Sequence, residues 1–241
     1  MAVSSKTYLE ICQDVVRECG ISGTLTTTVS QTGEFNRVVN WVKQAWTEIQ
    51  NRHIAWLFMR SSATVDTTAG DGTYAATDFT DENTSLAVSN FSHWLIDDLE
   101  DPPKAYLTST GVGDEYWLSW LEWYQFRTIY LVNQNRTTQG QPSYVSWDPT
   151  LNLRLGQLPN DIYTVTANYY RSAQKFSADT DTPTGLPAQF DDVIMYRAME
   201  KYAGYEAAQE VMIRATSEGN RLMRQLEMNQ LPAIRLGAPL A

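Results

Sequence analysis

A β-rich stretch, from about residue 63 to residue 171, lies between two segments with helical periodicity, and this order constrains the fold most strongly. Strands and helices that are segregated along a chain are typical of α+β proteins. The sequence therefore predicts an α+β fold, in which N- and C-terminal helices form a bundle and an antiparallel β domain is inserted between them. We expect a helical body at 1–58 and 186–230, an inserted β-rich domain at 59–185, and an extended C-terminal tail at 231–241.

Two amphipathic helices are predicted before the β-rich stretch. Thr7 and Glu10 fit a capping box at the start of the first helix, and Gly20 supplies a left-handed stop. Thr32 is expected to cap the second helix, with Glu34 near its positive end. Side chains on one face of the second helix recur at helical spacing: Phe35, Val38, Val42, Trp46, Ile49, His53 and Trp56.

Alternating apolar and polar residues predict strands and two hairpins. Residues 62–65 and 73–75 flank a Gly-rich segment, which is typical of a hairpin turn. Residues 151–155 and 163–169 alternate on either side of a turn at 158–161 and form the clearest predicted hairpin. The remaining predicted elements are a strand at 105–109, a strand at 116–120 and a helix at about 122–130.

Helical periodicity returns after Leu186-Pro187 and continues from about residue 190 to residue 228. Proline is favourable in the first turn of a helix, where its missing N–H costs nothing. A break or kink is expected near Gly204, because glycine costs about 1 kcal/mol relative to alanine inside a helix. Pro232 ends the helical run and begins the predicted tail.

Composition and charge exclude several classes of protein. Hydrophobic residues make up 43% and charged residues 19% of the 241 residues, as in ordinary globular proteins. The net charge of −10 argues against a nucleic-acid reader, although an acidic wall can form a passage for DNA, since like charge prevents sticking. No signal sequence is expected at the N-terminus, and the apolar run at 54–59 is too short to span a membrane. Cys12 and Cys19, about 10 Å apart along one predicted helix, are expected to be reduced thiols in a cytoplasmic setting.

Catalytic and metal-binding motifs are not found in the sequence, so we expect neither enzyme activity nor a metal or cofactor. The acidic run at 97–101 is expected to be a solvated loop rather than a cation site. Asp179 and Asp181 begin like an EF-hand loop, but Phe190 stands where the bidentate glutamate is required. A hydrolase that uses a carboxylate such as Asp97 or Asp192 stays open, because carboxylate separation depends on the fold.

An aromatic cluster and an apolar tail are the two candidate binding features. The cluster comprises Tyr116, Trp117, Trp120, Trp123, Tyr124 and Phe126. We favour a core or subunit interface for it, and a carbohydrate- or receptor-binding platform is the alternative function. The tail carries Leu231, Ile234, Leu236 and Leu240, while prolines keep it extended. An apolar segment that leaves its own domain is typical of a docking peptide, and a frayed terminus is the alternative interpretation.

In order and spacing, several segments resemble the head-to-tail adaptor (connector, neck) proteins of tailed bacteriophages. Residues 7–20 and 34–50 are similar to the first two helices of that family, and residues 153–170 are similar to its strand-turn-strand. Leu186-Pro187 before a long helical stretch that Leu231-Pro232 closes is similar to its C-terminal part. The insert at 77–104 departs from the shorter family members.

The resemblance implies a structural protein of the virion neck that is assembled in the host cytoplasm and does not contact a membrane. The resemblance also implies that about twelve copies form a ring, a closed cyclic oligomer, beneath the portal protein, and that a downstream tail or nozzle protein follows. Genomic DNA would pass through without sequence-specific binding. By position, the portal-docking residues implied are Leu231, Ile234, Arg235, Leu236, Pro239 and Leu240.

Overall fold

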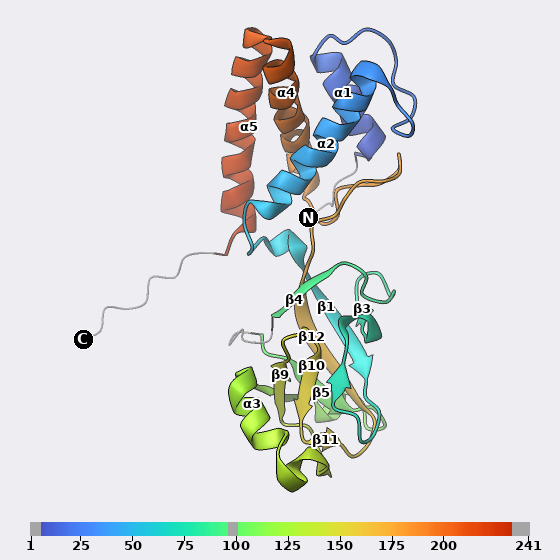
Figure 1. The fold of residues 1–241 in the computed structure, drawn as a ribbon, viewed down its shortest axis with the longest axis vertical. Coiled ribbons are helices and arrows are strands. Elements are labelled where there is room, and N and C mark those ends of the chain that lie inside the picture. Colours follow the sequence, from blue (N-terminus) through green and yellow to red (C-terminus); the bar gives the residue numbers. More distant parts are fainter. Residues whose placement is uncertain (1–5, 96–100, 233–241) are drawn as a thin grey trace, which may run out of the picture. The chain divides into compact units, whose positions relative to one another are not determined.

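The computed structural model describes residues 6–95 and 101–232, and the chain divides into two compact units. Residues 1–59 and 173–241 form the first unit, here called the helical unit, and residues 60–172 form the β unit. In the described residues, five α-helices and mainly antiparallel sheets make the fold α+β, as the order of elements in the sequence predicted (Figure 1).

The helical unit is built from α1 (Tyr8–Glu18), α2 (Gly33–Asn51), α4 (Asp192–Glu206) and α5 (Gln209–Gln230), and Figure 1 shows these four helices together. The short helices η1 (Leu57–Met59) and η5 (Ala188–Phe190) complete it. α4 packs against each of the other three helices, which is why its buried residues are spread around it instead of forming one stripe.

The first two helices begin where the sequence predicts. The Thr7 hydroxyl accepts from the Glu10 backbone N–H, and the Glu10 carboxylate accepts from the Thr7 N–H at 2.7 Å, which completes the capping box. Thr32 occupies the N-cap of α2 but makes no capping hydrogen bond with its side chain. α2 ends at Asn51, so His53 and Trp56, which we had placed on its stripe, lie beyond the helix.

Residues 173–185 belong to the helical unit and not to the β-rich domain predicted at 59–185. The carbonyl oxygens of Asp179 and Asp181 accept the backbone N–H groups of Leu9 and Tyr8, at 3.2 and 2.7 Å. These N–H groups have no partner inside α1, so the loop at 177–184 satisfies the start of that helix. The C-terminal segment of the helical unit therefore begins at residue 173 instead of residue 186.

The C-terminal helical run breaks at Ala207, three residues after the predicted position at Gly204. Ala207 ends α4 in the left-handed conformation, with φ of 52°, and Gly204 remains inside the helix. Alanine is strained in this conformation because its Cβ approaches the backbone, and glycine is the residue that usually ends helices in this way.

We expect Ala207→Gly to stabilise the helical unit by about 0.5–1 kcal/mol, because glycine adopts a positive φ without strain. Ala208 has φ of −81°, so Ala208→Gly is the matched control and should leave stability unchanged or lower it. Urea unfolding followed by far-UV circular dichroism measures both. A loss of stability in Ala207→Gly would contradict the strain at this residue.

The β unit contains two main sheets. The six-stranded sheet has the order β3-β1-β12-β5-β6, with β4 also paired to β12, and the four-stranded sheet has the order β2-β10-β9-β7. The first consists of β1 (Arg60–Asp66), β3 (Thr80–Asp81), β4 (Phe91–Leu95), β5 (Lys104–Leu107), β6 (Tyr116–Trp117) and β12 (Tyr163–Arg171). The second consists of β2 (Thr73–Tyr74), β7 (Ser119–Trp120), β9 (Tyr144–Trp147) and β10 (Leu153–Gly156). The elements outside these sheets are η2 (Ala76–Asp78), η3 (Val112–Asp114), α3 (Trp123–Tyr130), η4 (Asn133–Arg136), and the paired β8 (Gln139–Gly140) and β11 (Leu158–Pro159).

Both predicted hairpins are wrong in their pairing. β1 pairs with β12 and β3, while β2 pairs with β10 in the other sheet. β10 pairs with β9 and β2, while β12 joins the six-stranded sheet. Each of these strands has one apolar face. That face is buried equally well whether the strands lie in two stacked sheets or pair as neighbours in one sheet.

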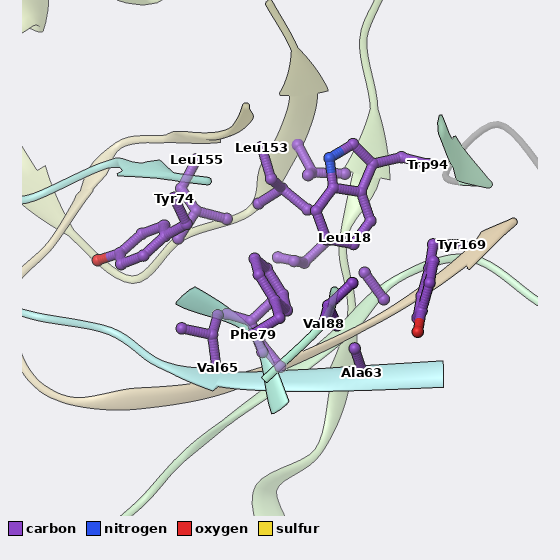
Figure 2. Close-up of a cluster of buried hydrophobic side chains, with 14 residues drawn as sticks. Ala63, Val65, Tyr74, Phe79, Val88, Trp94, Leu118, Leu153, Leu155 and Tyr169 are labelled. Atoms are coloured by element: carbon purple, nitrogen blue, oxygen red, sulfur yellow. The ribbon is translucent and has the colours of Figure 1, made fainter. Parts of the chain in front are cut away.

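The core of the β unit lies between the two sheets and is formed by their apolar side chains. In Figure 2, Phe79 and Val88 lie between Ala63 and Val65 of β1 and the two leucines of β10, Leu153 and Leu155. The strand predicted at 116–120 is split at Leu118, which is 1% exposed and belongs to this core. One half of it, β6, joins the six-stranded sheet, and the other half, β7, joins the four-stranded sheet.

Candidate docking surfaces

The helical part of the chain ends at α5, where the predicted docking tail begins. Leu231 is half-buried, and its backbone N–H donates to the Glu227 carbonyl at 3.0 Å, while Pro232 is exposed. The other predicted docking residues lie outside the described part of the chain: Ile234, Arg235, Leu236, Pro239 and Leu240. The structure thus gives the starting point of the tail, and the docking role of these residues stays a prediction.

Glu227 ties the last turn of α5 to the end of α2. Its carboxylate lies 2.7 Å from Arg52 Nε and 3.1 Å from His53 Nε2. Burial alone would raise the pKa of Glu227, but the hydrogen bonds from His53 and Arg52 outweigh it and lower that pKa. His53 is half-buried and lies edge-on to Trp56. This cluster holds the residues that precede the tail in a fixed place on the helical unit.

A shallow groove of about 420 Å³ lies along the last turns of α5 and η5. Among the described residues, its lining consists of Gln189, Phe190, Gln225, Met228 and Asn229, none of which is charged. Met228 is 82% exposed, which is unusual for a long apolar side chain next to a groove. Amide and apolar groups in this mixture suit contact with a polypeptide better than with a charged small molecule.

The predicted aromatic cluster is divided between core and surface. Phe126 is 1% exposed, and Trp123 stacks on it with ring centroids 5.9 Å apart. Trp117 and Tyr124 are 58% and 69% exposed. The two tryptophans Trp117 and Trp120 belong to different sheets, so the cluster is not one continuous strand face.

The candidate catalytic and metal-binding groups have structural partners. The carboxylate of Asp179 accepts from the Thr28 N–H, and that of Asp181 accepts from the N–H groups of Ser177 and Ala178. Asp192 is ion-paired with Lys6 at 2.7 Å, and Asp97 lies outside the described residues. Burial raises the pKa of Cys12 far above its usual range, which disfavours the reactive thiolate.

Among residues 6–95 and 101–232, no three His, Cys, Asp or Glu side chains are grouped closely enough to hold a metal ion. None of the helices in the described ranges is both long and apolar enough to cross a membrane.

Comparison with known proteins gives one family. No curated protein matches the chain. The family model described as SU10 adaptor protein matches residues 6–237, which include both units and the first part of the predicted tail. Since this match extends over nearly the whole sequence, the chain belongs to the SU10 adaptor protein family.

Proposed function

We propose that this protein forms the head-to-tail adaptor ring of a tailed bacteriophage. Family membership indicates a structural adaptor of the phage head-tail junction and carries the proposal. In the proposed assembly about twelve copies attach to the portal protein as one closed cyclic oligomer. The ring links the capsid to a downstream tail or nozzle protein and continues the channel through which the genome passes.

The tail is the part that we assign to portal docking. α5 ends at Gln230, and an eleven-residue segment with four large aliphatic residues and two prolines follows. The family match continues through Ile234, Arg235 and Leu236 and ends at residue 237. Prolines restrict the chain to extended conformations, which lowers the entropy lost when such a segment binds.

Repetition around the ring makes a short tail sufficient. A single extended peptide with a few apolar anchors binds weakly, but once one tail of a ring is bound, the others bind at a high effective concentration. Avidity then exceeds the affinity of one tail by roughly 10²–10⁴. This explains how a tail of eleven residues can hold a whole ring on its partner.

The charge of the protein agrees with a channel for DNA. The β unit contains fourteen Asp and Glu residues against six Lys and Arg, while the helical unit contains fourteen against twelve. An acidic surface repels the phosphate backbone, so DNA passes without being retained.

Truncation of the tail tests the proposal. Native mass spectrometry of the chain with the portal protein encoded beside it should show a complex with a ring of adaptor copies. A chain that ends at Gln230 should lose this complex and keep its circular dichroism spectrum, because the tail follows the last helix.

Two further variants separate docking from folding. A chain that ends at Pro232 keeps the half-buried Leu231 and should also fail to bind, since the remaining anchors are absent. A full-length chain with Ile234→Ser, Leu236→Ser and Leu240→Ser keeps the length of the tail and should bind at least about 10²-fold more weakly, because avidity is lost. Normal portal binding by all three variants would overturn the docking assignment.

A further inference from the structure

Three of the six cations of the β unit lie around α3. Arg127 belongs to α3, Arg136 to η4 and Arg154 to β10. Residues 123–147 contain no Asp or Glu, although the β unit as a whole carries a net charge of −8. The most acidic unit of the protein therefore has one basic face.

These arginines lack acidic partners in the described part of the β unit. Arg136 donates to the Leu131 carbonyl at 2.8 Å, and Arg154 donates to the Thr73 hydroxyl and lies 5.9 Å from the centre of the Trp123 ring. Neither these two nor Arg127 forms an ion pair with a described carboxylate; Lys104, by contrast, pairs with Glu115 at 3.1 Å. Unpaired guanidinium groups at a protein surface are well suited to bind carboxylates of a partner.

The same face gathers exposed aromatic and aliphatic side chains. Tyr124 is 69% exposed, and Trp120 is 39% exposed in β7, which pairs with β9 beside α3. Tyr144 of β9 is 37% exposed, and its ring centroid lies 5.9 Å from that of Tyr130. Arginine, tyrosine and tryptophan are the residues enriched at protein interfaces, and they dominate their binding energy.

Arg136 and Arg154 line one small cavity together with Phe126 and Tyr130. Its volume of about 30 Å³ is sufficient for a water molecule or the end of a side chain, and too small for a nucleotide or a sugar. Two arginines that meet at such a cavity favour a single carboxylate group as occupant.

We infer that this surface, which we call the α3 face and define as Trp120, Tyr124, Arg127, Arg136, Tyr144 and Arg154, binds the acidic surface of the β unit of a neighbouring copy. The charge complementarity is contained in the chain itself, since one unit provides both the unpaired arginines and an excess of carboxylates. Its exposed carboxylates outside the α3 face include Asp66, Asp71, Asp78, Glu82, Asp114 and Asp161.

A contact between two different surfaces of identical copies is heterologous, and such contacts close into rings when the rotation permits. The inference thus rests on the proposed adaptor ring and identifies the surface that joins adjacent copies. DNA is a poorer partner than a neighbouring copy, because the carboxylates around the α3 face repel a uniform polyanion, whereas an identical unit can place its own cations beside those carboxylates.

Sedimentation velocity of the full-length chain, alone and with the portal protein, tests this contact. The double variant Arg127→Glu and Arg136→Glu should weaken association between copies by about 100-fold or more, since two attractions become repulsions. Arg221→Glu with Arg224→Glu is the matched control, because both arginines are exposed on α5 and the change of net charge is the same.

Tyr124→Ser should weaken association without any change of charge. Wild-type association should also fall as NaCl rises from 0.05 to about 0.5 M, as screening weakens charge pairs.

The outcomes distinguish this inference from the proposed function. If the Arg127/Arg136 variant assembles as the wild type does, or if the wild type never associates under either condition, the α3 contact is overturned. A variant that loses association between copies and binds the portal only weakly, as single tails do, supports both proposals. Fluorescence anisotropy with a labelled 30-base-pair duplex covers the remaining partner: DNA binding that the double variant loses would assign the α3 face to nucleic acid and overturn the contact between copies.

Discussion

Asp81→Ala should unfold or severely destabilise the β unit. We expect the free energy of unfolding to fall by about 3–5 kcal/mol at neutral pH, because the buried polar groups that donate to the Asp81 carboxylate would lose their acceptor. Asp81 is 4% exposed, and its carboxylate accepts from Ser61 Oγ at 2.6 Å and from the Tyr169 hydroxyl at 2.7 Å. It also accepts the backbone N–H groups of Asn83 and Thr84, each at 2.9 Å. One side chain thus connects β1, β3 and β12.

Hydrogen–deuterium exchange with mass spectrometry localises the effect of Asp81→Ala. Peptides from residues 60–95 and 101–172 should lose protection, while peptides from α1 and α2 should keep it. Asp78→Ala is a suitable control on the neighbouring segment, since Asp78 is exposed and its carboxylate accepts the Ala75 N–H at 2.7 Å. That variant should lose about 1 kcal/mol, as an N-terminal cap does. An equal effect of the two variants would contradict the central role of Asp81.

The effect of Asp81 should depend on pH. Burial alone would raise the pKa of Asp81, but the hydrogen bonds from Ser61, Tyr169 and the two backbone N–H groups lower it below the ordinary value of 3.8. The stability that the carboxylate provides is therefore complete above about pH 4 and is lost as the pH falls through the folded-state pKa. Urea titrations should show that the difference in the free energy of unfolding between the wild type and Asp81→Ala becomes smaller below pH 4.

Trp46→Ala should destabilise the helical unit by about 3–5 kcal/mol, because it leaves a large cavity and removes a hydrogen bond. Trp46 of α2 is completely buried, and it stacks with Phe58 and Phe176, with ring centroids 6.0 and 6.1 Å away. Its indole N–H donates to the Gln174 side chain at 3.0 Å. The residue therefore joins the N-terminal and C-terminal segments of the unit.

Two variants make the Trp46 result interpretable even if Trp46→Ala fails to fold. Trp46→Phe keeps most of the volume and loses the Gln174 bond, so it should cost about 1–2 kcal/mol. Trp41→Ala on the same helix removes a half-buried ring that meets Tyr202 edge-on at 6.1 Å, and it should cost less than Trp46→Ala. Urea unfolding measured by circular dichroism ranks the three variants by their free energy of unfolding. If Trp46→Ala lost no more stability than Trp41→Ala, the packing argument would be contradicted.

The candidate surfaces were only partly predictable from the sequence. The aromatic cluster was visible, but the arginines that accompany it were missed, because Arg127 and Arg154 are 27 positions apart and belong to different elements. One signal was available: no acidic residue occurs between residues 123 and 147 of a strongly acidic chain. The tail was found by its composition, and Leu231 is the member of the predicted docking set that the structure describes.

The sequence by itself determined the fold class and the capping box of α1, and it placed the break in the C-terminal helical run to within three residues, although Gly204 stays helical and Ala207 ends the helix. The capping box depends on hydrogen bonds between residues three positions apart, and the fold class follows from separate segments of helical and strand periodicity, so neighbouring residues specify both. Only the tertiary structure decided the pairing of the strands and the membership of residues 173–185. The alternation of apolar and polar residues shows which face of a strand is apolar, but several partner strands would bury that face equally well. Which strands pair therefore depends on contacts between residues that are far apart in the chain, such as Ser61 and Tyr169.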